Sequence, residues 1–371
     1  MRIFHLSAEH FVELDALPEA LPAQGFVWLG CERREFETLQ AELQIALQRW
    51  TGGQLVDLHV SDLLNDQLPS HYDYTSWYDL MAFRRLAAGA VSEAPLTDEG
   101  LGAADSARRV LATIDTSPVG FALFDRVLVT VDPPDCPVRE YFAQRLASMA
   151  GKGEARGEAR ASARLPGHPA DLMLRMLNHM VDSYLELRRL LTRQLGTLEA
   201  ELLDPRSRFD DWQVLLESRK ALHMLEDTCE DQRSAVQEWI DALDEWPDAA
   251  DDQTRREREL LRVRARDVLE HIERVLGHVR RLEQSAEAAV QMHFSALGHR
   301  TNDIMRTLTV LTATLLPLNL ITGFFGMNFE ALPLIHSSSG FWVAFALMVC
   351  LGLGLVIYFH RNRYLSNGRR H

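Results

Sequence analysis

A stripe of mainly polar residues runs through the first of two long apolar stretches near the C-terminus. Its members recur at steps of three and four and so share one face of a helix: Asn302, Met305, Thr309, Thr312, Leu316, Asn319 and Gly323. The stretch around them is apolar, and an amide or hydroxyl that faces lipid is costly. This face must therefore meet water or another helix. A water-filled pore would use its oxygens to bind cations, and helix packing through small and hydroxylated residues is the alternative.

Two threonines of the same stretch lie off this stripe. For Thr307 and Thr314 we expect the ordinary role, in which the hydroxyl donates to a carbonyl of its own helix. For Asn302 and Asn319 the pore is the favoured interpretation, because an uncapped carboxamide that faces lipid is costly.

A second group of possible ligands lies upstream. Asp267, His271 and His278 are spaced i, i+4 and i+7, which places them on one face of a helix. Imidazole together with carboxylate can bind a softer ion such as zinc. A solvated helix face with no bound ion is the alternative, and it is the commoner role of such histidines.

No motif for catalysis accompanies these residues. The sequence has no HExxH pair, Walker loop or nucleophile elbow, and no cysteine-histidine pair in a suitable setting. Its four cysteines, Cys31, Cys136, Cys229 and Cys350, are far apart and indicate neither disulfides nor a structural zinc site. We therefore expect no enzyme and no cofactor, with divalent cations as the only ligands.

The charge balance restricts the partners. The formal net charge is −14 at pH 7, and a nucleic-acid partner would require a basic surface. An acidic domain suits cations, although acidity can also serve solubility alone. The N-terminus, MRIFHLSAEHFVEL, lacks the basic start and apolar core of a secretory signal, so we expect the soluble part to remain in the cytoplasm.

Two apolar runs near the C-terminus predict membrane spans. Charged residues are absent from Thr307 to Phe329 and again from Ala331 to Phe359, and each run can cross a hydrocarbon core roughly 30 Å thick. Arginines flank the outer ends of the pair, and none lies in the loop between the spans. The positive-inside rule then places both termini in the cytoplasm and the protein in the cell (inner) membrane.

Composition divides the chain into segments. Residues 1–150 have short β-branched and aromatic runs between helical stretches, which predicts a cytoplasmic α/β or α+β domain, and residues 151–167, rich in Gly, Ala and alternating charge, predict a flexible connector. The segments expected after it are long antiparallel cytoplasmic helices at 168–253, a stalk helix at 254–303, a first transmembrane helix at 304–328, an outer loop at 329–340, a second transmembrane helix at 341–360 and a basic cytoplasmic tail at 361–371.

Within these segments the sequence patterns predict individual strands and helices. Apolar runs at 25–30, 79–86 and 121–131 predict strands. Apolar residues three and four apart predict one long helix at 171–203 and a second over about 208–244.

The stalk helix carries a sustained seven-residue repeat. Its apolar positions are Ala265, Val268, Ile272, Val275, Val279, Leu282, Ala286 and Ala289. This repeat predicts packing against other helices along its length. No proline lies between Pro247 and Pro317, so the stalk is expected to continue into the first span as one helix.

The end of the first span resembles a family signature. Gly326-Met327-Asn328, followed by a short loop, a second span and a basic tail, is similar to the signature of the CorA family of magnesium and cobalt channels. Thr301 to Met305 resembles the family's inner-pore segment, Pro317 matches its mid-span proline, and Arg266-Asp267-Val268 matches a segment on its stalk. From about Gly25 onward, the order of domain, long helices and stalk is also the family's.

The resemblance implies a funnel-shaped homopentamer, in which five first-span helices line a pore. Magnesium holds its waters tightly, so the implied selectivity filter of Gly326, Met327 and Asn328 would bind those waters through the Asn328 amide. Apolar members of the pore would form constrictions that gate by dewetting. The implied pore-lining residues are Asn302, Met305, Leu308, Thr309, Thr312, Leu316, Asn319 and Gly323.

For gating, the resemblance implies acidic residues on the cytoplasmic domain that bind intracellular magnesium. Asp267 is the position that the Arg-Asp-Val match carries over, and Asp182 is a weaker match for a second acid. His271, one helical turn from Asp267, is a further possible ligand. The partner of Asp267 in the first domain stays open among Asp79, Asp98 and Glu99.

The outer loop departs from the family at one place. Glu330 keeps the first acid, but Leu334 stands where the family often has a second Glu, which removes carboxylates that would gather cations. The ion is therefore open between Mg²⁺, with Co²⁺ and Ni²⁺, and the Zn²⁺ of the related ZntB-type transporters. A non-transporting coiled-coil scaffold or sensor anchored in the membrane is the alternative of another class, although an anchor needs neither the stripe nor Gly-Met-Asn.

Overall fold

The computed structural model describes residues 1–7, 10–88, 102–134, 136–153, 165–204, 212–246, 251–327 and 340–361. The chain divides into two compact units, Met1–Glu287 and Ala288–His371. Each unit is described by itself below.

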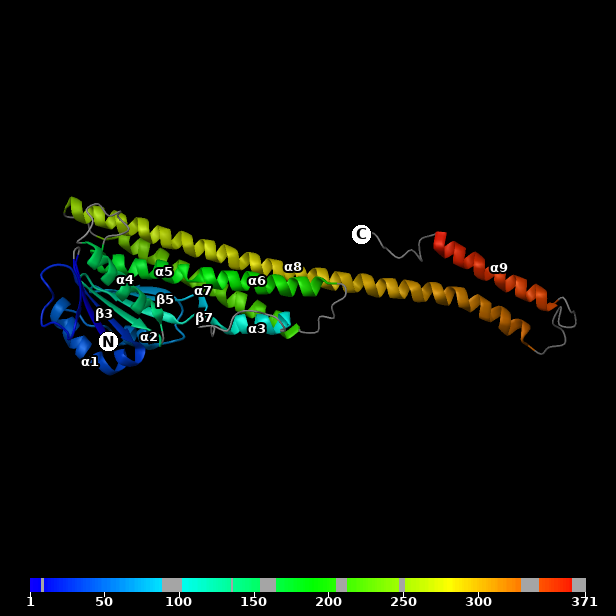
Figure 1. Ribbon diagram of the computed structural model, residues 1–371, viewed down its shortest axis with the longest axis horizontal. Coiled ribbons are helices and arrows are strands. Elements are labelled where there is room, and N and C mark those ends of the chain that lie inside the picture. Colours follow the sequence, from blue (N-terminus) through cyan, green and yellow to red (C-terminus); the bar gives the residue numbers. More distant parts are fainter. Residues whose placement is uncertain are drawn as a thin grey trace. The chain divides into compact units, whose positions relative to one another are not determined.

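The N-terminal unit is built on a mixed seven-stranded sheet (Figure 1). Among the described strands, β3 and β9 form the one parallel pair, with Val27 opposite Val127, and the others pair antiparallel. Two short strands, β6 (Ala87–Ala88) and β7 (Ile114–Asp115), form a separate ladder. The order across the large sheet is β2 (Phe11–Leu14), β1 (Arg2–Leu6), β3 (Phe26–Glu32), β9 (Val127–Asp132), β8 (Pro118–Leu123), β5 (Asp79–Arg84) and β4 (His71–Tyr74).

The central strands are buried on both faces, as uninterrupted apolar runs predict. Every residue of β8 and β9 is buried, as is every residue of β3 except Glu32. Helices α1 (Arg33–Thr51) and α2 (Asp57–Leu64) cover one face, and α4 (Pro137–Gly153) and α5 (Pro169–Asp182) cover the other (Figure 1). The core under α1 and α2 includes Leu29, Phe36, Leu43, Val60, Leu63 and Val129.

The run at 121–131 contains two strands, so its assignment to a single strand was wrong. β8 and β9 form a hairpin in which Leu123 pairs with Leu128, and the Phe124 N–H donates to the Val127 carbonyl at 2.9 Å. The chain turns within three residues, and only Asp125 and Arg126 interrupt the apolar sequence there. The strand 79–86 ends earlier than expected, at Arg84.

Long helices complete this unit. These include α6 (Tyr184–Leu203) and α7 (Trp212–Asp244), and the shorter helix α3 (Ala103–Ala112) packs against both. The seven-residue repeat of α8 (Asp252–Phe325) is buried at Ala265, Ile272 and Val279, each 0% exposed. The expectation that this repeat packs against other helices is confirmed, and its partners include helices of the same chain.

Several helix boundaries differ from those expected. The helix predicted at 171–203 is two, α5 and α6, separated at Ser183, whose hydroxyl donates to the Met180 carbonyl at 2.6 Å. α4 reaches Gly153, inside the expected connector, of which residues 154–164 lie outside the described part. α8 begins at Asp252 because the Asp251 carboxylate accepts from the Thr254 N–H at 2.6 Å and caps the first turn.

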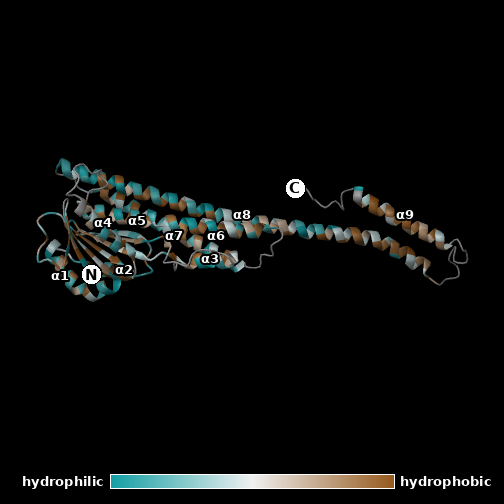
Figure 2. Cartoon of the chain, viewed as in Figure 1, coloured by the Kyte–Doolittle hydropathy of each residue, from teal (hydrophilic) through white to brown (hydrophobic). Residues whose placement is uncertain are grey.

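The C-terminal unit contains the last part of α8 and α9 (Gly340–Arg361). Both helices are long and apolar enough to cross a membrane, with mean hydropathies of 1.7 and 2.4 over their most apolar windows. Figure 2 shows that α9 is the most uniformly hydrophobic helix, whereas the helices of the N-terminal unit mix hydrophilic and hydrophobic residues. α8 ends at Phe325, so the expected end at residue 328 was wrong for Gly326 and Met327, which follow the helix.

The repeat on α8 provides a stability test. Ile272→Ala removes a side chain that is 0% exposed, and it should lower the free energy of unfolding by about 2–5 kcal/mol. Val263→Ala on the same helix truncates a side chain that is 61% exposed and should change it by less than about 0.5 kcal/mol. Thermal unfolding of the purified chain, followed by circular dichroism, checks this. Equal midpoints for the two variants would contradict the packing of the repeat.

Candidate ion pathway and metal-binding residues

In the C-terminal unit, one face of α8 is packed. Leu318 lies beside Gly352 of α9, where an added Cβ would sit 3.8 Å from the Leu318 Cδ1 atom. The more buried residues of α9 recur at four-residue steps and include Gly340, Ala344 and Gly352, and such small residues let two helices approach closely. The buried or half-buried residues of this part of α8 are Arg306, Val310, Thr314, Pro317, Leu318, Ile321 and Phe325.

The polar stripe lies on the other side of α8. All seven of its residues are exposed, among them Leu316 at 69% and Met305 at 57%. With 3.6 residues per turn, Leu316 and Asn319 point more than about 100° away from Val310 on the packed face. Within the described residues α9 therefore does not cover the stripe, and helix packing inside one chain does not explain it.

The threonine hydroxyls make the same hydrogen bonds on the stripe as off it. Thr309 and Thr312 donate to the carbonyl four residues earlier at 2.7 and 2.9 Å, and Thr307 and Thr314 do the same at 2.9 and 2.8 Å. The expected back-bonding of Thr307 and Thr314 is confirmed, but it is shared by the stripe. A hydroxyl that donates keeps acceptor lone pairs, so Thr309 and Thr312 can still accept from the waters of a hydrated cation.

The two asparagines of the stripe have open amides. Asn302 and Asn319 are exposed, and within the described part of the chain their carboxamides make no hydrogen bond; the Thr322 hydroxyl reaches only the Asn319 backbone carbonyl, at 3.0 Å. A carboxamide oxygen is a neutral acceptor of the kind that suits hydrated cations. These two amides are therefore available to accept hydrogen bonds from a hydrated cation.

The filter motif is described only in part. The Gly326 N–H donates to the Thr322 carbonyl at 2.9 Å, and a Cβ at residue 326 would lie 2.9 Å from that same oxygen. Glycine is thus required by the close approach of the preceding helical turn. Met327 is 45% exposed. Asn328 and Glu330, expected at the filter and the outer loop, lie outside the described residues.

Asp182, Asp267 and His271 come together in the N-terminal unit. His271 Nδ1 is 3.6 Å from Asp182 Oδ1 at the end of α5, and its Nε2 is 3.9 Å from Asp267 Oδ1 on α8. Both acids are about half exposed and line a cavity of about 340 Å³. The imidazole lies between the two acids, so a single ion could not contact all three side chains as they stand. A cation could enter through its waters, or after the ring turns.

Three arginines line this cavity, and the buried Asp171 forms ion pairs with two of them. These two are the half-buried Arg175 and Arg264. His179, also on the cavity wall, stacks on Tyr141 with 4.0 Å between ring centroids, and burial lowers its pKa, which favours the neutral ring.

His278 does not belong to this group, so neither the possible zinc face of Asp267, His271 and His278 nor the commoner solvated face describes this residue. His278 is 8% exposed. Its Nδ1 is 2.8 Å from the Tyr184 hydroxyl and its Nε2 is 3.3 Å from the Thr192 hydroxyl. Both ring nitrogens are thus engaged between α6 and α8, because the i+7 position turns into the helix interface.

The possible acidic partners of Asp267 lie elsewhere. Asp98 and Glu99 are outside the described residues. Asp79 accepts from the Tyr72 hydroxyl at 3.2 Å and lines a different cavity, of about 480 Å³. Burial raises the pKa of Asp79 to about 6. Within one chain the structure does not bring Asp79 to Asp267.

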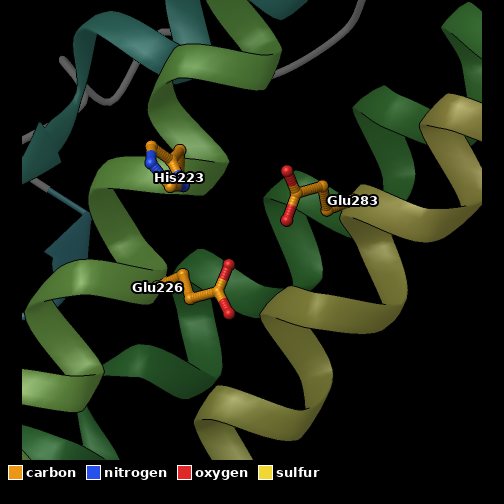
Figure 3. Close-up of side chains that lie close together, drawn as sticks. All are labelled: His223, Glu226 and Glu283. Atoms are coloured by element: carbon orange, nitrogen blue, oxygen red, sulfur yellow. The ribbon is translucent and has the colours of Figure 1, made fainter.

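A further cluster escaped the sequence analysis. His223 and Glu226 on α7 and Glu283 on α8 lie together (Figure 3), with one ligand atom of each within 4.8 Å of the others. The spacing of His223 and Glu226 on one helix was a usable signal. Nothing in the pattern indicates that Glu283 joins them, because that contact depends on how α7 and α8 pack.

Comparisons with known proteins agree on the family. The family model described as "CorA-like Mg2+ transporter protein" matches residues 105–361. The chain is 29% identical over 100 residues to the cobalt/magnesium transport protein CorA of Thermotoga maritima, covering 27% of this chain and 28% of that protein. It is 35% identical over 101 residues to the magnesium transport protein CorA of Yersinia pseudotuberculosis, covering 27% and 32%. Both alignments span less than a third of these relatives.

The fold comparison extends over the whole chain. The CorA magnesium transporter from Methanocaldococcus jannaschii superposes with a TM-score of 0.69, covering 97% of this chain and 98% of that one at 19% identity. At this identity the match establishes the fold alone. It confirms the expected α+β domain with long helices, a stalk helix and two C-terminal apolar helices.

The buried His278 gives a pH test. Burial, together with the charges of Arg188 and Arg281, lowers its pKa from 6.5 to about 4, so the unfolded chain binds this proton at a higher pH than the folded one. The stability should therefore fall as the pH decreases from about 6.5 to about 4. His278→Gln should show a smaller decrease in thermal midpoint over this range, whereas His10→Gln, at an exposed position, should behave as wild type. An unchanged pH dependence in His278→Gln would exclude this role.

Proposed function

Since this chain belongs to the family of CorA-like Mg²⁺ transporter proteins, we propose that it conducts divalent cations across a membrane through a pore lined by the polar stripe of α8. The observation that carries this proposal is the open stripe itself. Its residues are exposed on the side of α8 that does not pack against α9, and its oxygens are neutral acceptors. Relatives named above are transport proteins, so transport is favoured over catalysis.

The proposal requires several copies of the chain. One chain supplies two apolar helices, and two helices cannot enclose a pore. The uncovered face of α8 would be shared by neighbouring copies around an axis, with α9 on the lipid side. The number implied by the family resemblance is five. Arginines before the first span and after the second support a cytoplasmic position for both termini, by the positive-inside rule.

Mg²⁺ is the proposed physiological ion, with Co²⁺ and Ni²⁺ as further substrates. Mg²⁺ dehydrates reluctantly, and a stripe of carboxamides and hydroxyls suits an ion that keeps its waters. From the inner end, Asn302, Thr312 and Asn319 would form polar rings, and Asn328 would follow Gly326 and Met327 at the filter. The apolar Met305, Leu308 and Leu316 would form the constrictions between them.

We propose that Asp182, Asp267 and His271 form the regulatory site. Two partly exposed acids at the end of α5 and on α8 face one cavity, and their charges would attract cytoplasmic cations. Asp267 belongs to the same helix as the stripe, so a cation bound there could change the position of the pore-lining residues. Binding of the ion would then close the pore when the cytoplasmic concentration is high.

Ion uptake into proteoliposomes tests the pore. Wild type should take up Mg²⁺, and Asn319→Ala and Asn328→Ala should each reduce uptake by at least about tenfold, because every copy around the pore loses the amide that bonds to the waters of the ion. Thr307→Ala, off the stripe, is the matched control and should conduct as wild type. The same assay with Co²⁺, Ni²⁺ and Zn²⁺ ranks the ions.

Each outcome of this assay decides a specific point. A wild-type protein that moves no cation would favour the membrane scaffold or sensor over a channel. Zn²⁺ uptake in excess of Mg²⁺ uptake would favour the ZntB-type alternative. Unchanged conduction and selectivity in Asn328→Ala would remove that residue from the filter.

Closure by cytoplasmic magnesium tests the regulatory site. In wild type, currents should decrease as millimolar Mg²⁺ is added to the cytoplasmic side. Asp267→Asn should need a several-fold higher Mg²⁺ concentration for the same decrease, because one of the two acids has lost its charge. Glu273→Gln, at an exposed position of the same helix, should retain the wild-type response. If Asp267→Asn closes at the wild-type concentration, Asp267 is not part of the sensor.

A further inference from the structure

We infer that His223, Glu226 and Glu283 form a second cation site, which binds a borderline transition metal such as Zn²⁺ and links α7 to α8. The ligand atoms of the three side chains lie within 4.8 Å of one another. Figure 3 shows the carboxylates of Glu226 and Glu283 directed toward each other from the two helices, with His223 one helical turn away on α7. A single ion between them is reached by small side-chain rotations.

The helices hold these side chains in place. His223 and Glu226 are three residues apart on α7 and so project from the same face. Arg280, one turn from Glu283 on α8, donates to Glu226 at 2.7 Å and also pairs with Glu230. These ion pairs fix the two helices side by side at the level of the cluster. The ligand side chains thus all project from regular helices.

The donor set selects the class of ion. One imidazole nitrogen and two carboxylate oxygens suit Zn²⁺, Co²⁺ or Ni²⁺, whereas Mg²⁺ prefers oxygen ligands and retains its waters. Three protein ligands leave a fourth position for water. Asp227 Oδ2 is 4.0 Å from His223 Nε2, near enough to orient the ring after a small movement, as carboxylates beside metal-bound histidines do.

The charges of the cluster favour a bound cation. Arg280 donates to one oxygen of Glu226 at 2.7 Å, so one edge of this carboxylate already meets a positive charge. Glu283 brings the oxygens of a second carboxylate to the same place, and a cation between two carboxylate groups interacts favourably with both. Arg280 meets one edge of Glu226, and an ion between Glu226 and Glu283 would neutralise the side that Arg280 does not reach.

The site is accessible from solvent. The His223 side chain is 68% exposed, and Glu226 and Glu283 are half-buried. An ion can therefore enter without any opening of the core. This site differs from the proposed regulatory site in helix pair, since it joins α7 and α8 and not α5 and α8. It also differs in geometry, since its three ligand atoms lie within 4.8 Å of one another, whereas His271 stands between Asp182 and Asp267 and meets each with a different ring nitrogen.

Zinc titration of the intact, chelator-treated protein in detergent, in the presence of excess Mg²⁺, tests this inference. Wild type should bind one more Zn²⁺ per chain than His223→Ala, and Glu283→Gln should weaken that binding by at least about tenfold. Zn²⁺ should also raise the thermal midpoint of wild type more than that of either variant. Glu287→Gln, exposed one turn beyond Glu283, is the matched control and should bind as wild type.

The result that overturns the inference is equal Zn²⁺ stoichiometry and affinity in wild type, His223→Ala and Glu283→Gln. An equal loss in Glu287→Gln would also overturn it, because the effect would then be one of general surface charge. His223 is exposed, so His223→Ala should retain the metal-free thermal midpoint of wild type. This variant therefore tests the zinc site even if Glu283→Gln unfolds. The titration requires no transport, so its failure and the failure of the channel proposal are separate results.

Discussion

Burial of one face of α8 is the interaction on which the rest of the structure depends. In the N-terminal unit, Ala265, Ile272 and Val279 are completely buried, and burying one such aliphatic side chain contributes about 1.5–3 kcal/mol. In the C-terminal unit the same helix packs through Val310 and Leu318 and leaves its polar stripe uncovered. A single helix thus uses apolar faces for cohesion in both units and keeps oxygens available where no apolar partner covers them.

The periodic features were visible in the sequence because each is a local pattern. The seven-residue repeat of α8, the two apolar runs and the stripe from Asn302 to Gly323 each follow from helical spacing, and the structure places these residues on the faces that spacing predicts. The sequence was less informative about turns. Asp125 and Arg126 alone mark the hairpin between β8 and β9, and Ser183 separates α5 from α6 while keeping helical backbone angles.

Contacts between distant residues could not be predicted in the same way. Spacing correctly placed Asp267 beside His271, but only the packing of α5 on α8 brings Asp182 to the other side of the ring. The same spacing misplaced His278, since a position seven residues along turned from the surface into the interface with Tyr184. The contact of Glu283 with His223 and Glu226 likewise depends on tertiary packing, for which a single sequence has no direct signal.

The distribution of charge on α8 explains how a well-packed helix can still respond to ions. Its buried repeat is apolar and its Tyr184–His278 hydrogen bond is neutral. Its ion pairs of Arg280 with Glu226 and of Arg262 with Asp244 lie at the surface, whereas that of Arg264 involves the buried Asp171. Exposed ion pairs contribute about 0–1 kcal/mol each. Cations that compete for these carboxylates therefore disturb only weak interactions and leave the apolar core intact. A divalent ion that two helices share, by contrast, holds both at once, so the bound state can favour one arrangement of α8 without any loss of fold.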